Sequence, residues 1–173
     1  MKSPCVLLKS AMQIYKTYYK SPLGPIEIVA SPTSILALHF VEDILPGDGE
    51  PTFCAKECLK QLGEYFNGER RNFFLTLQPV GTDFQKAVWR HLEKIPYGET
   101  TSYGEIADAL GKPAASRAVG SANGKNPIAI IIPCHRVIGK DGSLTGYGGG
   151  LWRKRWLIGF EKGEIQPPSD ISA

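Results

Sequence analysis

The feature that most constrains the fold is a short apolar run that ends in three chemically active side chains. Residues 127–132 carry no charge and are rich in β-branched side chains, and Pro133, Cys134, His135 and Arg136 follow directly. Runs of this kind are typical of buried strands, so we predict a buried extended segment. Pro133 has no N–H to donate, so it should end the pairing of this segment with a neighbouring strand. The sequence therefore predicts a cysteine held rigidly at the base of a pocket.

Cys134 has two possible interpretations. Most free cysteines are buried and structural, yet polar residues follow this one, which favours a reactive thiol. A thiol attacks as thiolate and needs a base. His135 is the obvious base, but neighbouring side chains on an extended chain point to opposite faces, so direct contact is not expected. A bridging water could carry the proton, and Glu161, at the end of an apolar helix, is our candidate carboxylate behind the imidazole.

Composition indicates an ordinary soluble globular protein. The chain has 173 residues, 42% of them hydrophobic and 21% charged, enough for one domain or two small ones. No apolar run is long enough to span a bilayer and no signal peptide is evident, so we expect a cytoplasmic protein that does not contact membranes. Four cysteines are too few for a disulfide scaffold, and reduced thiols are expected.

The net charge of +3 is unevenly distributed. Residues 1–80 hold eight Lys or Arg against eight Asp or Glu, whereas residues 112–155 hold eight Lys or Arg against Asp141 alone, an excess of seven. The region around Cys134 is therefore basic, which favours a polyanionic partner. A solvated basic face without any partner is the alternative.

The first 80 residues predict a small antiparallel sheet. Three β-rich runs are separated by turn residues, and a fourth run alternates like one more strand. The runs cover residues 13–20, 25–30, 35–41 and 71–78. Pro79 and Gly81 then break the pattern. This break separates a predicted N-terminal α/β domain, residues 1–80, from a C-terminal domain, residues 81–173.

One helix is expected between the third and fourth runs. Its helically spaced apolar positions are Cys54, Cys58, Leu62 and Tyr65 or Phe66, and Asn67 with Gly68 should end it. For Cys54 and Cys58 we favour packing in the core over metal binding, because two ligands do not complete a metal site. The other candidate ligands, Cys5, His39 and His91, are scattered along the chain, so no metal is expected.

The second domain is predicted to be mainly helical. Two capping-box pairs, Thr82 with Gln85 and Ser102 with Glu105, should open helices, and Pro113 should start another over residues 114–123. The last two form a helix-turn-helix with the later helix as the candidate recognition element. The predicted fold class is α+β: a small sheet with a helix, then a helical domain containing a winged-helix-like helix-turn-helix.

The candidate recognition helix consists almost entirely of small residues, with Arg117 as its one long cation. Small side chains let a helix backbone approach its target closely, which suits a shallow or narrow DNA groove better than direct reading of bases. Tight packing inside the protein explains the same composition equally well.

A glycine-rich loop, residues 139–150, follows the cysteine and carries one aromatic residue, Tyr147. Its glycines permit close approach of the backbone to a flat ligand. A last amphipathic helix over residues 151–161 should present Arg153, Lys154 and Arg155 on a polar face. The tail from about residue 165 should be disordered.

Several separated motifs resemble the O6-alkylguanine-DNA alkyltransferase family. They are residues 133–137, Asn126-Pro127, Gly146-Tyr147, Gly149-Gly150-Leu151, residues 96–103, residues 116–120 and the segment from Trp156 to Glu161. The resemblance covers most of residues 82–163, with corresponding spacings. In the first 80 residues it is limited to the general layout.

The family transfers an alkyl group from O6 of guanine in duplex DNA, and less readily from O4 of thymine, irreversibly to its own cysteine. The resemblance implies that Cys134 is the acceptor, that His135 is its base through a water, and that Glu161 orients His135. It also implies that Asn126 supports the active-site segment and that Tyr103 protonates the leaving guanine.

The resemblance further implies how the base and the DNA are bound. Tyr147 and the Gly148 backbone would lie beside the base, although several relatives carry Ser or Ala in place of Gly148. Arg117 would fill the gap that a flipped nucleotide leaves. The other expected DNA contacts are Ser116, Ala118, Ser121, Ala122, Lys125 and Arg136. The implied partner is double-stranded DNA with alkylated bases, bound in the minor groove by a monomer without a cofactor; cooperative binding stays open.

Two other functions remain open from the sequence. A DNA-damage-binding sensor would need the helix-turn-helix but not the thiol of Cys134. A Cys-His hydrolase would need Cys134 and His135 in direct contact, which adjacent residues achieve poorly.

Overall fold

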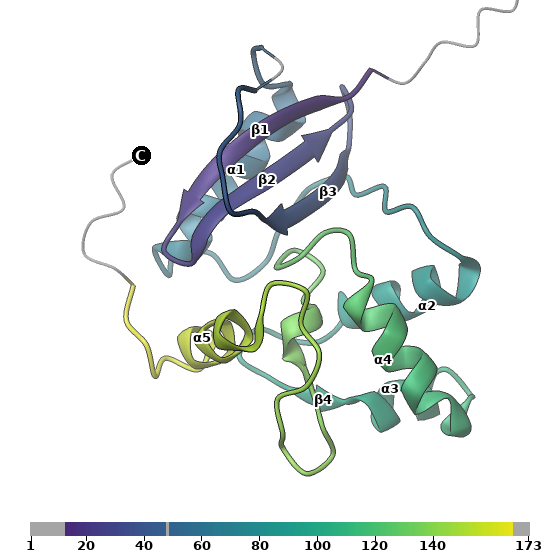
Figure 1. Cartoon of the computed structure of the whole chain (residues 1–173). Coiled ribbons are helices and arrows are strands. Elements are labelled where there is room, and N and C mark those ends of the chain that lie inside the picture. The colour runs from purple at the N-terminus through teal and green to yellow at the C-terminus, as the bar shows by residue number, and fades with distance from the viewer. Residues whose placement is uncertain (1–12, 48, 168–173) are drawn as a thin grey trace, which may run out of the picture.

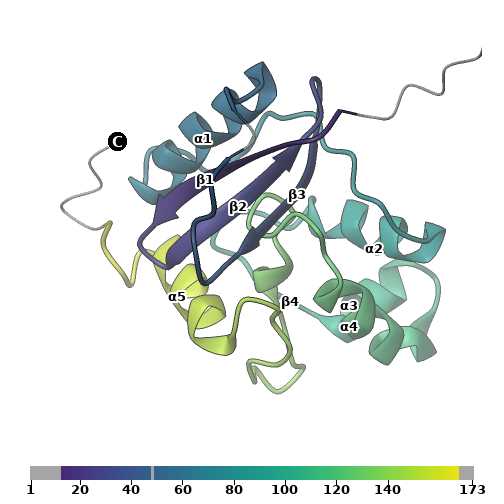
Figure 2. The ribbon, with the colours of Figure 1, turned by 45° about the horizontal axis from the view of Figure 1, so that its top comes forward.

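The N-terminal part of the chain folds into a three-stranded antiparallel sheet covered by one helix. The computed structural model describes residues 13–47 and 49–167. Strands β1 (Tyr15–Ser21), β2 (Gly24–Ala30) and β3 (Ile35–Phe40) pair in the order β1-β2-β3, and helix α1 (Phe53–Phe66) packs against one face (Figures 1 and 2). The first three predicted strands are therefore confirmed.

Helix α1 forms where the spacing of apolar residues predicts it. Thr52 caps its N-terminus by accepting a hydrogen bond from the N–H of Ala55, and Gly68, with φ of +77°, follows its C-terminus. The predicted apolar stripe, including Cys54 and Cys58, is buried in the core. The packing interpretation of these two cysteines is thus the one that the geometry supports.

The fourth predicted strand, residues 71–78, is wrong. This segment makes one isolated parallel bridge, Ile35 with Leu77, and joins no ladder. The side chain of Gln61 explains the difference, because it accepts from the N–H of Phe74 at 2.8 Å and donates to the Phe74 carbonyl at 3.1 Å. A side-chain amide thus satisfies the backbone of Phe74, and within the described residues the segment hydrogen-bonds to β3 only at Ile35, through Thr76 and Gln78.

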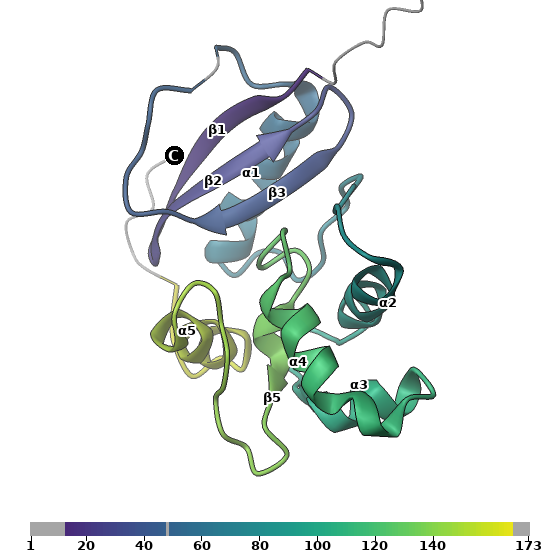
Figure 3. The ribbon, with the colours of Figure 1, turned by 45° about the vertical axis from the view of Figure 1, so that its right-hand side comes forward.

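The C-terminal part is mainly helical. Its elements are α2 (Asp83–Leu92), β4 (Thr101–Ser102), α3 (Tyr103–Ala109), the 3₁₀ turn η1 (Pro113–Ala115), α4 (Ser116–Gly124), the 3₁₀ turn η2 (Cys134–Arg136), β5 (Val137–Ile138) and α5 (Leu151–Glu161). Both predicted capping boxes are present, α3 packs against α4, and β4 pairs with β5 in parallel (Figure 3). The α+β class is confirmed.

The segment that delivers Cys134 is buried as predicted, but it is not extended. Leu38 of β3 pairs briefly with it, donating to the Pro127 carbonyl and accepting from the N–H of Ala129, both at 2.8 Å. The chain then turns back, with Ile132 N–H donating to the Ile128 carbonyl at 3.0 Å. Ile130 has φ of +69°, a conformation that costs a β-branched residue about 1–3 kcal/mol. Periodicity alone could not reveal this turn.

The two parts share aromatic contacts. Tyr65 of α1 packs edge-on against Phe160 of α5 at 5.8 Å between ring centroids, and Phe66 lies 6.1 Å from Trp156. No helix of the described residues is long and apolar enough to cross a membrane. Ile165 still packs against the core, whereas residues 168–173 of the predicted tail, like Cys5, lie outside the described residues.

Candidate active site

Cys134 lies at the wall of a cavity of about 230 Å³ and is 5% exposed. The cavity is lined by His39, Phe40, Asn123, Gly124, Asn126, Ala129, Cys134, Tyr147, Gly148 and Gly149. Four predicted site residues, Cys134, Asn126, Tyr147 and Gly148, therefore surround one space. A larger cavity of about 590 Å³ lies between residues 71–79 and α2, and Cys134 does not line it.

Asparagine side chains fix the backbone around the cysteine. Asn126 donates to the Ile132 carbonyl at 2.7 Å and accepts from the N–H of Ile128 at 3.0 Å. Asn123, a buried residue near the end of α4, donates to the Cys134 carbonyl at 3.3 Å. Sequence reasoning missed Asn123, because a polar residue near a helix end gives no sign of such a contact.

A buried network of charges lies behind the cysteine and centres on Glu161. Its carboxylate is 2.8 Å from Nε2 of His135 and accepts from Arg136 Nε at 2.8 Å and Nη2 at 3.0 Å. Tyr65 donates its hydroxyl at 2.7 Å and Gly98 its N–H at 3.2 Å. Burial by itself would raise the pKa of Glu161, but His135 and Arg136 hold it well below its usual range. The carboxylate is therefore ionised at neutral pH.

The ionised carboxylate fixes the tautomer of His135. Because Glu161 can only accept, Nε2 of His135 carries the hydrogen of that bond, which leaves Nδ1 of a neutral ring as an acceptor. Nδ1 is buried and has no hydrogen-bond partner among the described residues. An imidazole held in this way can take up a proton. Tyr65, the missed member of the network, was visible in the sequence only as one more apolar position of α1.

The thiol of Cys134 is protonated at rest. Burial raises its pKa above the usual value, and this outweighs the opposing effects of the Asn126 side chain, the charge of Lys154 and nearby backbone N–H groups. The site therefore holds a shielded thiol that needs a base before it can attack.

Two of the expected DNA contacts are wrong. Arg136 is 7% exposed, and its guanidinium is occupied by Glu161 and by the Ile95 carbonyl at 2.6 Å. Ala122 is 2% exposed and packs inward, where its carbonyl accepts from Nε1 of Trp89 at 2.9 Å. Neither residue is available to a ligand on the surface.

Lys154 does not lie on the polar face that the sequence suggested. It is fully buried, and its ammonium donates to the Thr145 carbonyl at 2.6 Å and to the Tyr103 hydroxyl at 3.4 Å. Burial lowers its pKa to about 8. The spacing of Lys154, Leu157 and Glu161 along α5 places all three on one face, a signal that the sequence did contain.

Tyr103 does not line the cavity. It begins α3, and its hydroxyl donates to the Thr145 carbonyl at 3.0 Å, beside the ammonium of Lys154. It is therefore linked to the loop that carries Tyr147 rather than to the thiol itself.

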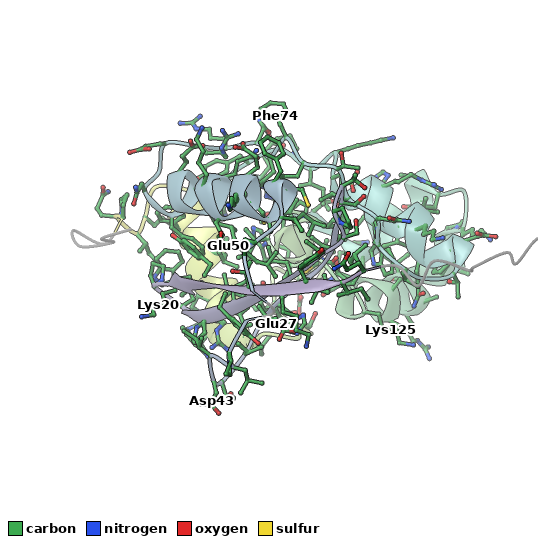
Figure 4. The ribbon with its side chains drawn as sticks, turned by 90° about the horizontal axis from the view of Figure 1, so that it is seen from above. Lys20, Glu27, Asp43, Glu50, Phe74 and Lys125 are labelled. Atoms are coloured by element: carbon green, nitrogen blue, oxygen red, sulfur yellow. The ribbon has the colours of Figure 1, made fainter. Side chains whose placement is uncertain are left out.

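Helix α4 has one buried and one exposed face. Val119, Ala122 and Asn123 are buried. The exposed face, here called the α4 outer face, consists of Arg117, Ala118, Ser121 and Lys125, with Ser116 half-buried beside it. Lys125 lies at the margin of the molecule in Figure 4. The small residues thus serve both interpretations, close internal packing and an approachable surface.

The described residues contain no group of three or more His, Cys, Asp or Glu side chains that could hold a metal ion. His39 instead lies 3.4 Å from Glu27. Together, a shielded thiol, an imidazole fixed by a carboxylate and the α4 outer face are the features expected of a protein that uses a cysteine as nucleophile on DNA.

Comparison with known proteins identifies the family of this chain. The family model for the "6-O-methylguanine DNA methyltransferase, DNA binding domain" matches residues 83–163, and that for the ribonuclease-like domain matches residues 14–79. A methylated-DNA--protein-cysteine methyltransferase of Methanosarcina barkeri is 48% identical over 158 residues, covering 88% of this chain and 100% of the relative. The Mycobacterium tuberculosis counterpart is 48% identical over 160 residues, covering 88% and 93%.

Solved structures are equally similar. The crystal structure of Mycobacterium tuberculosis O6-methylguanine methyltransferase has a TM-score of 0.79 at 45% identity, covering 92% of this chain and 98% of that chain. The structure of the mycobacterial protein in complex with DNA has a TM-score of 0.78 at 48% identity, covering 86% and 93%. The chain belongs to the methylated-DNA--protein-cysteine methyltransferase family, and its activity is that of a methyltransferase.

Proposed function

We propose that the protein repairs DNA by transferring the alkyl group of O6-alkylguanine, and less readily of O4-alkylthymine, irreversibly to Cys134. The observation that carries the proposal is the position of this thiol, which opens onto the cavity while His135 and Glu161 lie buried behind it. Each molecule would act once, because a thioether at Cys134 leaves no nucleophile.

The chemistry balances without a cofactor. The sulfur of Cys134 attacks the alkyl carbon, an S–C bond forms, and the C–O6 bond of the base breaks. His135 receives the thiol proton through a bridging water, and Glu161 stabilises the resulting imidazolium. Tyr103 would supply a proton to the departing guanine, for which its hydroxyl has to leave the Thr145 carbonyl and turn toward the cavity. Its hydroxyl is 3.4 Å from the Lys154 ammonium, which can return a proton to it.

The base must leave the duplex to reach the thiol. Cys134 is 5% exposed, so a stacked base cannot contact it, and extrusion costs a few kcal/mol of pairing and stacking. We assign the α4 outer face to the minor groove, with Arg117 filling the gap in the stack and Lys125 contacting phosphate. Asn126, Tyr147 and Gly148 would then surround the extruded base.

The test is the mass of the Cys134 peptide after incubation with a duplex that contains O6-methylguanine. One added methyl group on that peptide, together with restored guanine, is expected. Cys134→Ala is the matched control, which should bind the duplex and leave the lesion intact. An unmodified peptide beside an intact lesion refutes the proposal. Retained cellular protection by Cys134→Ala would instead indicate a damage sensor.

A further inference from the structure

The cavity over Cys134 has a wall that comes from the N-terminal sheet. His39 and Phe40, the last residues of β3, line it together with the C-terminal residues. Phe40 is held in the sheet opposite Ile26, and the next residue, Val41, donates its N–H to the Pro25 carbonyl at 2.9 Å. All the site residues expected from the sequence lie within residues 103–161, so this wall is a new component of the site.

One side chain joins this wall to the loop on the other side of the cavity. Arg153 donates from Nε to the Leu23 carbonyl at 2.8 Å and from Nη1 to the Gly149 carbonyl at 2.7 Å. Leu23 lies in the turn between β1 and β2, and Gly149 lies in the glycine-rich loop. Arg153 therefore links these two segments. Hydrogen bonds from a charged donor are about twice as strong as neutral ones.

The guanidinium of Arg153 also stacks on the wall. Its carbon lies 4.6 Å from the ring centroid of Phe40 and 4.4 Å from that of Trp152. Cation–π contacts of this length hold both partners in place. Arg153 therefore contacts the β1–β2 turn, strand β3 and the active-site loop at the same time.

Gly149 of the loop packs directly against the side chains of Phe40 and Tyr147. A Cβ atom added to Gly149 would lie 2.8 Å from Phe40 and 2.9 Å from Tyr147, closer than real Cβ atoms come to other atoms. The cavity is thus bounded on one side by a residue of the N-terminal sheet, and Arg153 contacts both that residue and the loop.

We propose that Phe40 is a specificity residue that limits the size of the alkyl group Cys134 accepts, and that Arg153 is the positioning residue that keeps Phe40 and the loop at this spacing. The inference rests on the proposed alkyl transfer and extends it to substrate range. A bulky alkyl group must fit beside Phe40, whereas a methyl group reaches the sulfur without displacing the wall.

The experiment compares single-turnover rate constants for O6-methylguanine and O6-benzylguanine placed in the same duplex. Phe40→Ala should raise the benzyl-to-methyl ratio of rates about tenfold, and Arg153→Ala about threefold, because the freed loop widens the cavity. Arg153→Lys should fall between Arg153→Ala and the natural protein, since lysine keeps the charge but not both hydrogen bonds. Phe40→Leu, which keeps an apolar side chain against Gly149, provides a variant with little risk of misfolding and should shift the ratio in the same direction.

Arg155→Ala is the matched control, because Arg155 is an exposed arginine of the same helix. Its ratio should equal that of the natural protein. A general structural role would slow both substrates equally, so unchanged ratios in Phe40→Leu, Phe40→Ala and Arg153→Ala would overturn the inference. That result is distinct from failure of the proposed function, in which the natural protein itself would not transfer the methyl group.

Discussion

The Glu161 network and the α4 outer face differ in almost every physical respect, although both are needed for the proposed reaction. The Glu161 side chain is 1% exposed, and Tyr65, His135, Arg136 and Gly98 all hydrogen-bond to it. The α4 outer face is exposed and carries small or flexible side chains. The network is arranged before any ligand arrives, whereas the proposed role of the outer face begins only when DNA is bound.

This contrast predicts where a substitution acts. In the buried network, removal of one partner leaves the others without a counter-charge, so stability and thiol reactivity should fall together. On the outer face, substitutions should leave stability almost unchanged and alter only the encounter with duplex DNA.

Glu161→Gln should give the largest effect. It removes the charge that pairs with His135 and Arg136, and breaking a buried ion pair typically costs about 3–5 kcal/mol of unfolding free energy. The single-turnover rate at pH 7 should fall at least about tenfold, because the imidazolium loses its counter-charge. Urea unfolding and rapid-quench kinetics measure the two effects. Glu164→Gln, at an exposed carboxylate just beyond α5, is the control; an unchanged rate in Glu161→Gln would remove this residue from the mechanism.

Acid should remove the contribution of the network selectively. The pKa of Glu161 in the folded chain is below its ordinary value of 4.5, so the unfolded chain binds the proton first as pH falls. The stabilisation is complete above about pH 4.5 and decreases as the pH drops toward the folded pKa. The difference in unfolding free energy between the natural protein and Glu161→Gln should therefore shrink below that pH. A constant difference down to the acid transition would contradict the assignment.

Tyr65→Phe tests whether helix α1 supports the network. It deletes one donor to Glu161 and keeps the ring packing, so a loss of about 1.5–3 kcal/mol is expected for a hydrogen bond to a charged group. The alkylation rate should fall less than in Glu161→Gln, because Arg136 and His135 still hold the carboxylate. Thermal unfolding and the same kinetics provide the measurement, with Tyr15→Phe as a control outside the core. A lower alkylation rate with an unchanged unfolding free energy would contradict the role of Tyr65 as a structural support of Glu161.

Arg117→Ala tests the outer face. The rate of repair in duplex DNA should fall about tenfold or more. The rate of reaction with free O6-methylguanine should not change, and the unfolding free energy should stay within about 0.5 kcal/mol of that of the natural protein. Rates on the two substrates are compared in the same buffer, with Arg155→Ala as an exposed control. Equal losses on both substrates would refute the role of Arg117 in base extrusion.

Much of the fold could be predicted because local rules decide it. The strands of the sheet alternate clearly, and Thr82 with Gln85 and Ser102 with Glu105 form the capping boxes that open α2 and α3. The prediction of a strand over residues 71–78 was wrong because a distant side chain, Gln61, satisfies the backbone of Phe74 in the middle of the segment. No local pattern records such a partner.

The candidate site could be predicted in part for the same reason. The motif around Cys134 indicated His135, and the position at the end of an apolar helix indicated Glu161. The fold brings these two side chains within 2.8 Å of each other. Arg136 and Lys154 were placed at the surface because charged residues usually lie there, yet tertiary partners hold both inside. Part of the basic excess around Cys134 is therefore internal, which leaves fewer cations for DNA than the sequence count suggests.

The number of methyl groups transferred per protein chain tests the central claim most directly. With a tenfold excess of duplex containing O6-methylguanine, the natural protein should reach a plateau of one methyl group per active chain, all of it on Cys134. Arg117→Ala should reach the same plateau more slowly, since its thiol and network are intact. Continued transfer beyond one group per chain, or a plateau carried by another residue, would contradict the account of Cys134 as an acceptor used once.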